Sequence, residues 1–140
     1  MPIERRVPLK KVQVVCAVIV FERRVLAVKR GSQMKMPGKW EFPGGKMETG
    51  ETPVQAIVRE IREELDMHIS VLDAWSAVRH DYGDFQIELM PFLCTTTEPQ
   101  PVLTEHESFQ WLDQNSLFDP DWAEADLPVR DRVAMWLVNN

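Results

Sequence analysis

The stretch GETPVQAIVREIREEL, from Gly50 to Leu65, decides how this chain folds. Thr52, Pro53 and Gln55 stand in the order of a helix start, with an N-cap, a proline in the first turn and a T-x-x-Q capping box. Apolar residues follow at the spacing of one helical face, so the stretch predicts an amphipathic helix. The apolar stripe comprises Val54, Ile57, Val58, Ile61 and Leu65.

Three acids lie on the other side of the predicted helix. Glu60, Glu63 and Glu64 have helical spacings of three and four, which bring their carboxylates together. Like charges so placed repel by roughly 0.2–0.5 kcal/mol per pair. A hard divalent cation would cancel this repulsion. The alternative is a solvated face in which Arg59 and Arg62 are interleaved with the acids, and on the helix alone this reading is favoured.

The segment just upstream favours a ligand site. Pro43, Gly44 and Gly45 predict a tight turn directly before the helix. A glycine-rich turn in this place can bring backbone carbonyls or amides against a ligand. Turn, helix cap and carboxylates would then form one compact unit.

The remaining segments mix strands with a second helix. A single domain spanning residues 1–140 is expected, with an α/β fold in which helices cover both faces of a mixed sheet. Strands are predicted at residues 12–20, 25–29, 40–42, 69–79, 85–95 and 108–112, loops at 31–39, 80–84, 98–107 and 119–126, and a closing helix after Pro128.

Composition limits the possible partners. The 140 residues are 44% hydrophobic and 27% charged, with a net charge of -6 and a pI near 5.1. No basic surface for duplex nucleic acid is expected, although a small nucleotide remains possible. Cys16 and Cys94 sit in apolar runs and predict buried thiols. With no signal peptide and no apolar run long enough to span a membrane, a cytoplasmic protein without a membrane partner is expected, as a monomer or homodimer.

The acidic helix and its glycine turn resemble the Nudix family. The residues from Gly45 through Glu51 to Arg59-Glu60-Ile61-Arg62-Glu63-Glu64 reproduce the box G-x5-E-x7-R-E-U-x-E-E-x-G-U. One position departs, because Asp66 stands where the box has glycine. That glycine ends the helix in a left-handed conformation, which Asp tolerates better than most residues, so a small stability cost and intact chemistry are expected.

The resemblance extends to the MutT-like branch, which hydrolyses nucleoside triphosphates to monophosphate and pyrophosphate. The segment KWEFPGGKMETGETP is similar to that branch, as are Trp111 and the segment Ala125-Asp126-Leu127-Pro128. The resemblance implies a Nudix fold and a requirement for Mg²⁺, for which Mn²⁺ can substitute. It also implies a role in clearing damaged or surplus nucleotides, which links the chain to DNA repair.

The box implies roles for individual residues. Glu60, Glu63 and Glu64 would bind the metal with the Gly44 carbonyl, and Arg59 would orient the glutamates. Either Glu60 or Glu105, an acid from outside the box, would take a proton from water. Glu105 is equally well read as an ordinary loop acid, and Glu51 is expected to be structural, near the helix start.

Substrate recognition is expected to involve Arg30, Asp126 and Phe85. Arg30 resembles a phosphate-contacting position, although alone it reads as a solvated cation. Asp126 occupies the position that reads the base, where it could accept from an exocyclic amine or donate if protonated. Phe85 stands where the strict oxidised-guanine enzymes have an arginine, and is more simply a core residue. His80 and His106 are read as ordinary polar positions.

Three functions compete at this point. The first is a pyrophosphohydrolase for oxidised or modified dNTPs such as 8-oxo-dGTP, and the second is a CTP or dCTP pyrophosphohydrolase. The third is a catalytically silent nucleotide-binding module. A silent module would not need all four charged residues of the box. The chain has all of them, namely Arg59, Glu60, Glu63 and Glu64, which argues against this function.

Overall fold

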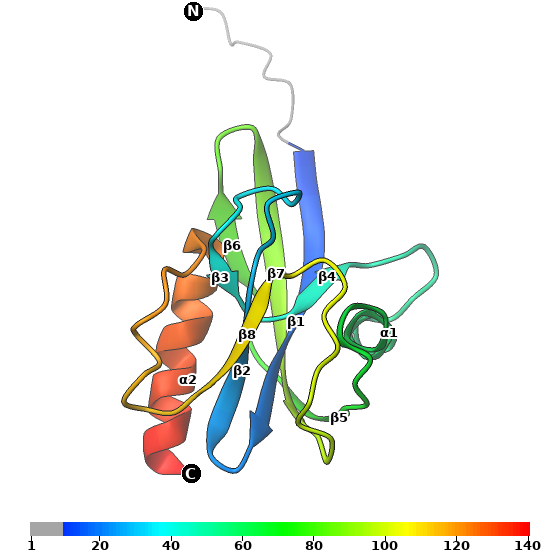
Figure 1. The fold of residues 1–140 in the computed structure, drawn as a ribbon. Coiled ribbons are helices and arrows are strands. Elements are labelled where there is room, and N and C mark those ends of the chain that lie inside the picture. Colours follow the sequence, from blue (N-terminus) through cyan, green and yellow to red (C-terminus); the bar gives the residue numbers. More distant parts are fainter. Residues whose placement is uncertain (1–9) are drawn as a thin grey trace, which may run out of the picture.

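The computed structural model describes residues 10–140 and places one mixed sheet between two helices (Figure 1). Strand order along the sheet is β3-β2-β1-β7-β5, while β4 pairs with β1, β6 with β7 and β8 with β2. The long central pair β1 and β7 is parallel, and the other pairs are antiparallel. The elements are β1 (Lys10–Phe21), β2 (Arg24–Lys29), β3 (Trp40–Glu41), β4 (Gly44–Lys46), α1 (Pro53–Leu65), β5 (Ser70–Ala74), β6 (Val78–Asp81), β7 (Phe85–Thr95), β8 (Ser108–Leu112), the 3-10 turn η1 (Glu124–Asp126) and α2 (Leu127–Asn139).

Strand β1 shows why both faces of the sheet need a helix. Successive side chains of a strand point to opposite faces. Val15, Ala17 and Ile19 join the apolar cluster that includes the buried residues of α1, whereas Cys16 and Val18 join the cluster that includes those of α2. The continuous apolar run of this strand is therefore buried on both sides. The predicted α/β/α layering is confirmed.

Helix α1 begins and ends as the sequence predicts. The Gln55 backbone N–H donates to Thr52 Oγ1 at 3.2 Å, and the Thr52 N–H donates to Gln55 Oε1 at 3.0 Å, which completes the capping box. At the other end Asp66 adopts the left-handed conformation, with φ 51° and ψ 41°, and its N–H donates to the Arg62 carbonyl. Asp66 thus takes over the conformation for which the box uses glycine.

The predicted tight turn at residues 43–45 is wrong. Gly44 and Gly45 belong to strand β4, which pairs with β1 through Cys16 and Val15, and neither glycine has a positive φ. They are needed because other groups approach too closely for a side chain. A Cβ on Gly44 would lie 1.9 Å from the Val15 carbonyl oxygen, and one on Gly45 would lie 2.4 Å from the Glu60 carboxylate.

The predicted strand at residues 69–79 is also wrong, because it is divided into β5 and β6. Both pair with β7, β5 ending at Ala74 opposite Phe92 and β6 starting at Val78 opposite Leu89. The break lies beside Pro91, which has no N–H to donate to a neighbouring strand. In the segment between the two strands the Trp75 side chain is buried, and the Trp75 backbone N–H donates to the Pro91 carbonyl at 2.9 Å.

Two further expectations concern thiols and membranes. Cys16 and Cys94 are free and buried, as predicted. Within residues 10–140, no helix combines the length and the apolar character that crossing a membrane requires.

Candidate active site

Arg59 organises the acidic face of α1. Its Nε and Nη2 both bond the Glu51 carboxylate, while Nη1 donates to Glu60 Oε1 and Glu63 Oε1, each at 2.9 Å. Nη2 also donates to the Lys46 carbonyl of β4 at 3.1 Å. The bidentate bond expected between Arg59 and the helix glutamates goes to Glu51. One guanidinium therefore joins the helix, the loop before it and the adjacent strand.

Burial and charge act against each other on these carboxylates. Burial raises the pKa of Glu60, and the bond from Arg59 opposes that rise. Burial also raises the pKa of Glu64, with a further contribution from the charge of Glu105. Glu63 is the open member of the group, with a side chain 59% exposed. The carboxylates on this face therefore differ in burial, and the Arg59 guanidinium lies beside them.

A cavity of about 490 Å³ lies beside this helix, between β1, β3, β4 and the β6–β7 hairpin. Among its lining residues are five of the predicted site positions: Gly44, Glu64, Arg30, Asp126 and Phe85. Arg59, Glu60, Glu63 and Glu105 do not line it. The cavity therefore joins the predicted substrate residues to the edge of the predicted metal site.

Asp126 is the buried acid of this cavity. It is 6% exposed, and its Oδ2 accepts the backbone N–H of Phe42 at 2.8 Å. Burial raises the pKa of Asp126 well above its usual value, and the nearby charge of Glu41 adds to this rise. An acid in such surroundings can hold a proton and act as a hydrogen-bond donor as well as an acceptor.

Two aromatic rings and two methionine side chains form another wall of the cavity. Phe85 stacks on Tyr82 with centroids 5.4 Å apart, and Lys35 Nζ lies 5.7 Å from the Phe85 centroid. Both rings line the cavity, together with Met34 and Met36. A flat apolar wall opposite hydrogen-bonding groups is the usual form of a small-molecule pocket.

Arg30 is held by groups of its own chain. Its Nη1 donates to Glu41 Oε1 at 2.7 Å, and its Nε donates to the Lys35 carbonyl. Two bonds fix the guanidinium at the cavity wall. Arg30 is therefore an ion-paired group rather than the solvated cation of the simpler reading.

Comparison with known proteins identifies the family. The model of the NUDIX domain matches residues 10–133. This chain belongs to the Nudix family. The predicted Nudix fold and the resemblance to its MutT-like hydrolases are confirmed.

Similar proteins in this Nudix family include hydrolases of more than one nucleotide. The chain is 32% identical to the 8-oxo-dGTP diphosphatase of Escherichia coli, over 86% of this chain and 95% of that one. It is 30% identical to the CTP pyrophosphohydrolase of the same organism, over 86% and 90%. The solution structure of the MutT protein from methicillin-resistant Staphylococcus aureus superposes with a TM-score of 0.75 at 37% identity, over 92% and 99%.

The carboxylates of the Nudix box provide ligands of the kind that a hard divalent metal ion prefers. Within the described part of the chain, no three His, Cys, Asp or Glu side chains converge as a complete metal cage. Mg²⁺ does not require one, because it binds through one or two carboxylates together with water and substrate phosphates. Glu64 Oε2 is buried and has no hydrogen-bond partner, which is the state of a ligand atom that awaits a cation. The donor set fits a hard divalent ion.

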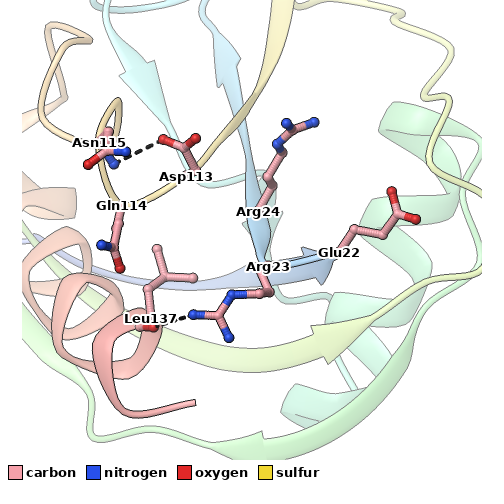
Figure 2. Close-up of a pocket in the computed structure, with 7 residues that line it drawn as sticks. All are labelled: Glu22, Arg23, Arg24, Asp113, Gln114, Asn115 and Leu137. Carbon is pink, nitrogen blue, oxygen red and sulfur yellow. Dashed lines mark hydrogen bonds between the residues drawn. The ribbon is translucent and has the colours of Figure 1, made fainter.

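A second hollow, of about 350 Å³, lies where β1 turns into β2, far along β1 from the Nudix cavity (Figure 2). Arg23 there donates to the Leu137 carbonyl at the end of α2, and Asp113 accepts the backbone N–H of Asn115. These two hydrogen bonds stabilise a turn and the end of α2, so we assign the hollow a structural role.

Two residues that contribute to the site were not anticipated from sequence. Glu41 bonds Arg30 and His106, which are far apart along the chain, and its charge acts on Asp126. His106 is buried although it lies in a loop, where a polar position was expected. No local pattern marks either residue, since their partners lie on distant segments.

Proposed function

We propose that this protein is a Mg²⁺-dependent nucleoside triphosphate pyrophosphohydrolase, which releases monophosphate and pyrophosphate and clears oxidised dNTPs such as 8-oxo-dGTP. The observation that carries the proposal is the shared cavity, which brings Asp126, Arg30 and Phe85 together with Glu64 and the Gly44 backbone. Its volume of about 490 Å³ is in the range of pockets for small ligands. The named relatives support the same reaction class.

The metal would be held by Glu60, Glu63 and Glu64 with the Gly44 carbonyl. When bound, a divalent cation neutralises phosphate charge and lowers the pKa of water. Mg²⁺ is the expected ion and Mn²⁺ the expected substitute. Arg59 orients Glu60 and Glu63 through its two bonds at 2.9 Å.

Proton transfer needs an acceptor near the triphosphate. Glu60 and Glu105 are the two candidates. Burial raises the pKa of Glu60 when no metal ion is bound, which increases its affinity for a proton. Glu105 is exposed, and its charge already acts on Glu64. Substituting each with glutamine and comparing the pH dependence of kcat would decide between them.

Arg30 would contact the phosphates and Asp126 the base, with Phe85 as the apolar wall. Phosphoryl transfer depends on positioning and charge neutralisation more than on covalent chemistry. The bond between Arg30 and Glu41 fixes the guanidinium in advance of substrate, so less side-chain entropy is lost on binding.

A CTP or dCTP pyrophosphohydrolase is the second candidate. Asp126 supports it, because a carboxylate accepts a hydrogen bond from the exocyclic amine of cytosine. The similarity to a CTP pyrophosphohydrolase points the same way. A small nucleotide as substrate, without duplex nucleic acid or membrane, and a cytoplasmic monomer or homodimer are expected for either function.

A panel of nucleotides with Mg²⁺ tests the proposal. The panel should include 8-oxo-dGTP, dGTP, CTP and dCTP, with separate detection of monophosphate, pyrophosphate and inorganic phosphate. We expect equal amounts of monophosphate and pyrophosphate, with 8-oxo-dGTP preferred. Preference for CTP or dCTP would select the second candidate. Release of inorganic phosphate would contradict the pyrophosphohydrolase assignment, and no turnover of any nucleotide would favour the silent module.

A further inference from the structure

Four polar side chains form a chain from the substrate residues to the helix glutamates. Arg30 Nη1 donates to Glu41 Oε1 at 2.7 Å, and His106 Nε2 hydrogen-bonds Glu41 Oε2 at 2.8 Å. On the other side of the same ring, His106 Nδ1 lies 3.9 Å from Glu64 Oε2. The four residues come from four separate segments of the chain, so the three contacts between them form only when the protein folds.

The imidazole at the centre of this chain is buried. Only 1% of the His106 side chain is exposed, compared with 15% for Glu41 and 21% for Glu64. Placing a polar ring out of water costs free energy that must be recovered by hydrogen bonds. A histidine that only filled the core would have both ring nitrogens satisfied.

One nitrogen of His106 is not satisfied. Among residues 10–140, Nδ1 of His106 and Oε2 of Glu64 are the two buried side-chain polar atoms that have no hydrogen-bond partner. They face each other, and 3.9 Å is too long for a hydrogen bond. The ring is therefore tied to Glu41 and adjacent to Glu64, with a small movement of the carboxylate able to close the gap.

We propose that His106 is a positioning residue whose two nitrogens serve two different parts of the site. Nε2 holds Glu41 and, through it, Arg30 on the nucleotide side, while Nδ1 faces the Glu64 carboxylate on the metal side and donates to it when both ring nitrogens carry a proton. Hydrogen-bond partners outside the ligand set orient carboxylates that bind a metal. The inference rests on the proposed function, because Glu64 is one of the proposed ligands.

Two substitutions separate the nitrogens. His106→Gln places an amide nitrogen near the position of Nε2 and removes Nδ1, whereas His106→Asn keeps a polar atom near Nδ1 and removes Nε2. His68→Gln is the matched control, since His68 is an exposed histidine just after α1 and does not line the cavity. Each protein is measured for Mn²⁺ binding without nucleotide, for binding of dGTP and CTP in EDTA, and for Tm.

The expected result is a split between the two variants. His106→Gln weakens Mn²⁺ binding roughly 10–100-fold, the range for a partner of a metal ligand, and leaves nucleotide binding within about twofold. His106→Asn weakens nucleotide binding by about tenfold and leaves Mn²⁺ binding near that of the wild type, on the scale of one buried hydrogen bond to a charged group. His68→Gln changes neither.

Parallel losses of both affinities in the two variants, or no loss in either, would overturn the inference. If either variant fails to fold, Glu41→Gln tests the same chain from the other partner. It must weaken nucleotide binding and spare Mn²⁺ binding, and equal losses would overturn the inference as well. Wild-type protein that binds Mn²⁺ but hydrolyses no triphosphate would reject the proposed function while leaving the split between variants as the test of His106.

Discussion

The carboxylates of α1 and the carboxylate of Asp126 occupy the same part of the molecule in different electrostatic settings. Glu60 and Glu63 share the guanidinium of Arg59, so burial of Glu60 is opposed by a bonded cation. Among residues 10–140, the hydrogen bond that the Asp126 carboxylate accepts comes from the Phe42 backbone N–H, and no cationic side chain there donates to it. The first setting suits the binding of a metal, and the second suits a hydrogen bond to a neutral base.

Removing a carboxylate from α1 has the largest expected effect. We predict that Glu63→Gln lowers kcat by about 100-fold or more with Mg²⁺ present, because loss of even a partner of a metal ligand costs about 10–100-fold. Stability should change by less than about 0.5 kcal/mol, since the Glu63 side chain is 59% exposed. Steady-state kinetics and Tm measure the two effects.

Glu48→Gln is the matched control for that experiment. Glu48 is an exposed acid whose Oε1 lies 3.6 Å from Arg59 Nε, so its substitution removes a charge near the same guanidinium without touching the proposed ligands. It should retain near-wild-type kcat. If Glu63→Gln also does so, the metal assignment is wrong.

The close contact between Gly45 of β4 and the Glu60 carboxylate of α1 can be tested without changing any charge. We predict that Gly45→Ala lowers kcat by roughly 10–100-fold, because the new methyl would lie 2.4 Å from the Glu60 carboxylate and displace it. The obstructing group is the end of a flexible side chain, so the fold should survive. Kinetics, Mn²⁺ affinity and Tm are the measurements.

Gly44→Ala gives the contrast within the same strand. There the methyl would meet the backbone oxygen of Val15 at 1.9 Å, and backbone cannot move aside without breaking the pairing of β4 with β1. Gly44→Ala should therefore lower Tm strongly, whereas Gly45→Ala should affect activity first. Equal losses of Tm in both variants would refute the distinction.

The sequence predicts features that depend on residues close together in the chain. Features set by neighbours along the chain were accurate at the two ends of α1, in the capping box of Thr52 and the left-handed Asp66. The predicted apolar stripe is right only in part, because Ile57, Ile61 and Leu65 are buried whereas Val54 and Val58 are exposed. Helical spacing also accounts for Glu60 and Glu63 sharing the Arg59 guanidinium, whereas the predicted metal site of Glu60, Glu63 and Glu64 stays a prediction.

Features set by distant segments were not predicted. Gly44 and Gly45 were expected in a turn because glycine usually marks one, yet their reason is the close approach of Val15 and Glu60. The break between β5 and β6 depends on a proline in the partner strand. Glu41 and His106 meet across 65 positions, and no local spacing can indicate such a pair.

At the base side of the cavity, a substitution that keeps shape should change specificity more than rate. We predict that Asp126→Asn changes the ratio of kcat/KM for 8-oxo-dGTP to that for CTP by roughly threefold to tenfold, the value of one hydrogen bond. With its oxygen accepting the Phe42 N–H, the amide would present only donors to the base, whereas the carboxyl group can present an acceptor or, when protonated, a donor. The dependence on Mg²⁺ concentration should be unchanged. An unaltered ranking of substrates would remove Asp126 from base recognition.

The smallest expected effect is on stability, and it depends on pH. Because the pKa of Asp126 is raised well above 3.8 in the folded protein, the unfolded chain ionises at lower pH than the folded one. Below the unfolded pKa both states are protonated. As pH rises from there through the folded pKa, the wild type loses stability, and above the folded pKa the loss is complete and constant.

Asp126→Asn removes this titration while retaining an oxygen that can accept the Phe42 N–H. The free energy of unfolding of the variant, relative to the wild type, should therefore increase with pH through that window and then level off. Urea unfolding at pH values from about 4 to 9 measures it. Asp119→Asn, at an exposed acid of the same type, supplies the baseline. A difference between Asp126→Asn and wild type that stays constant over this range would mean that Asp126 titrates alike in the folded and unfolded states, and burial of this carboxyl would then not set its protonation.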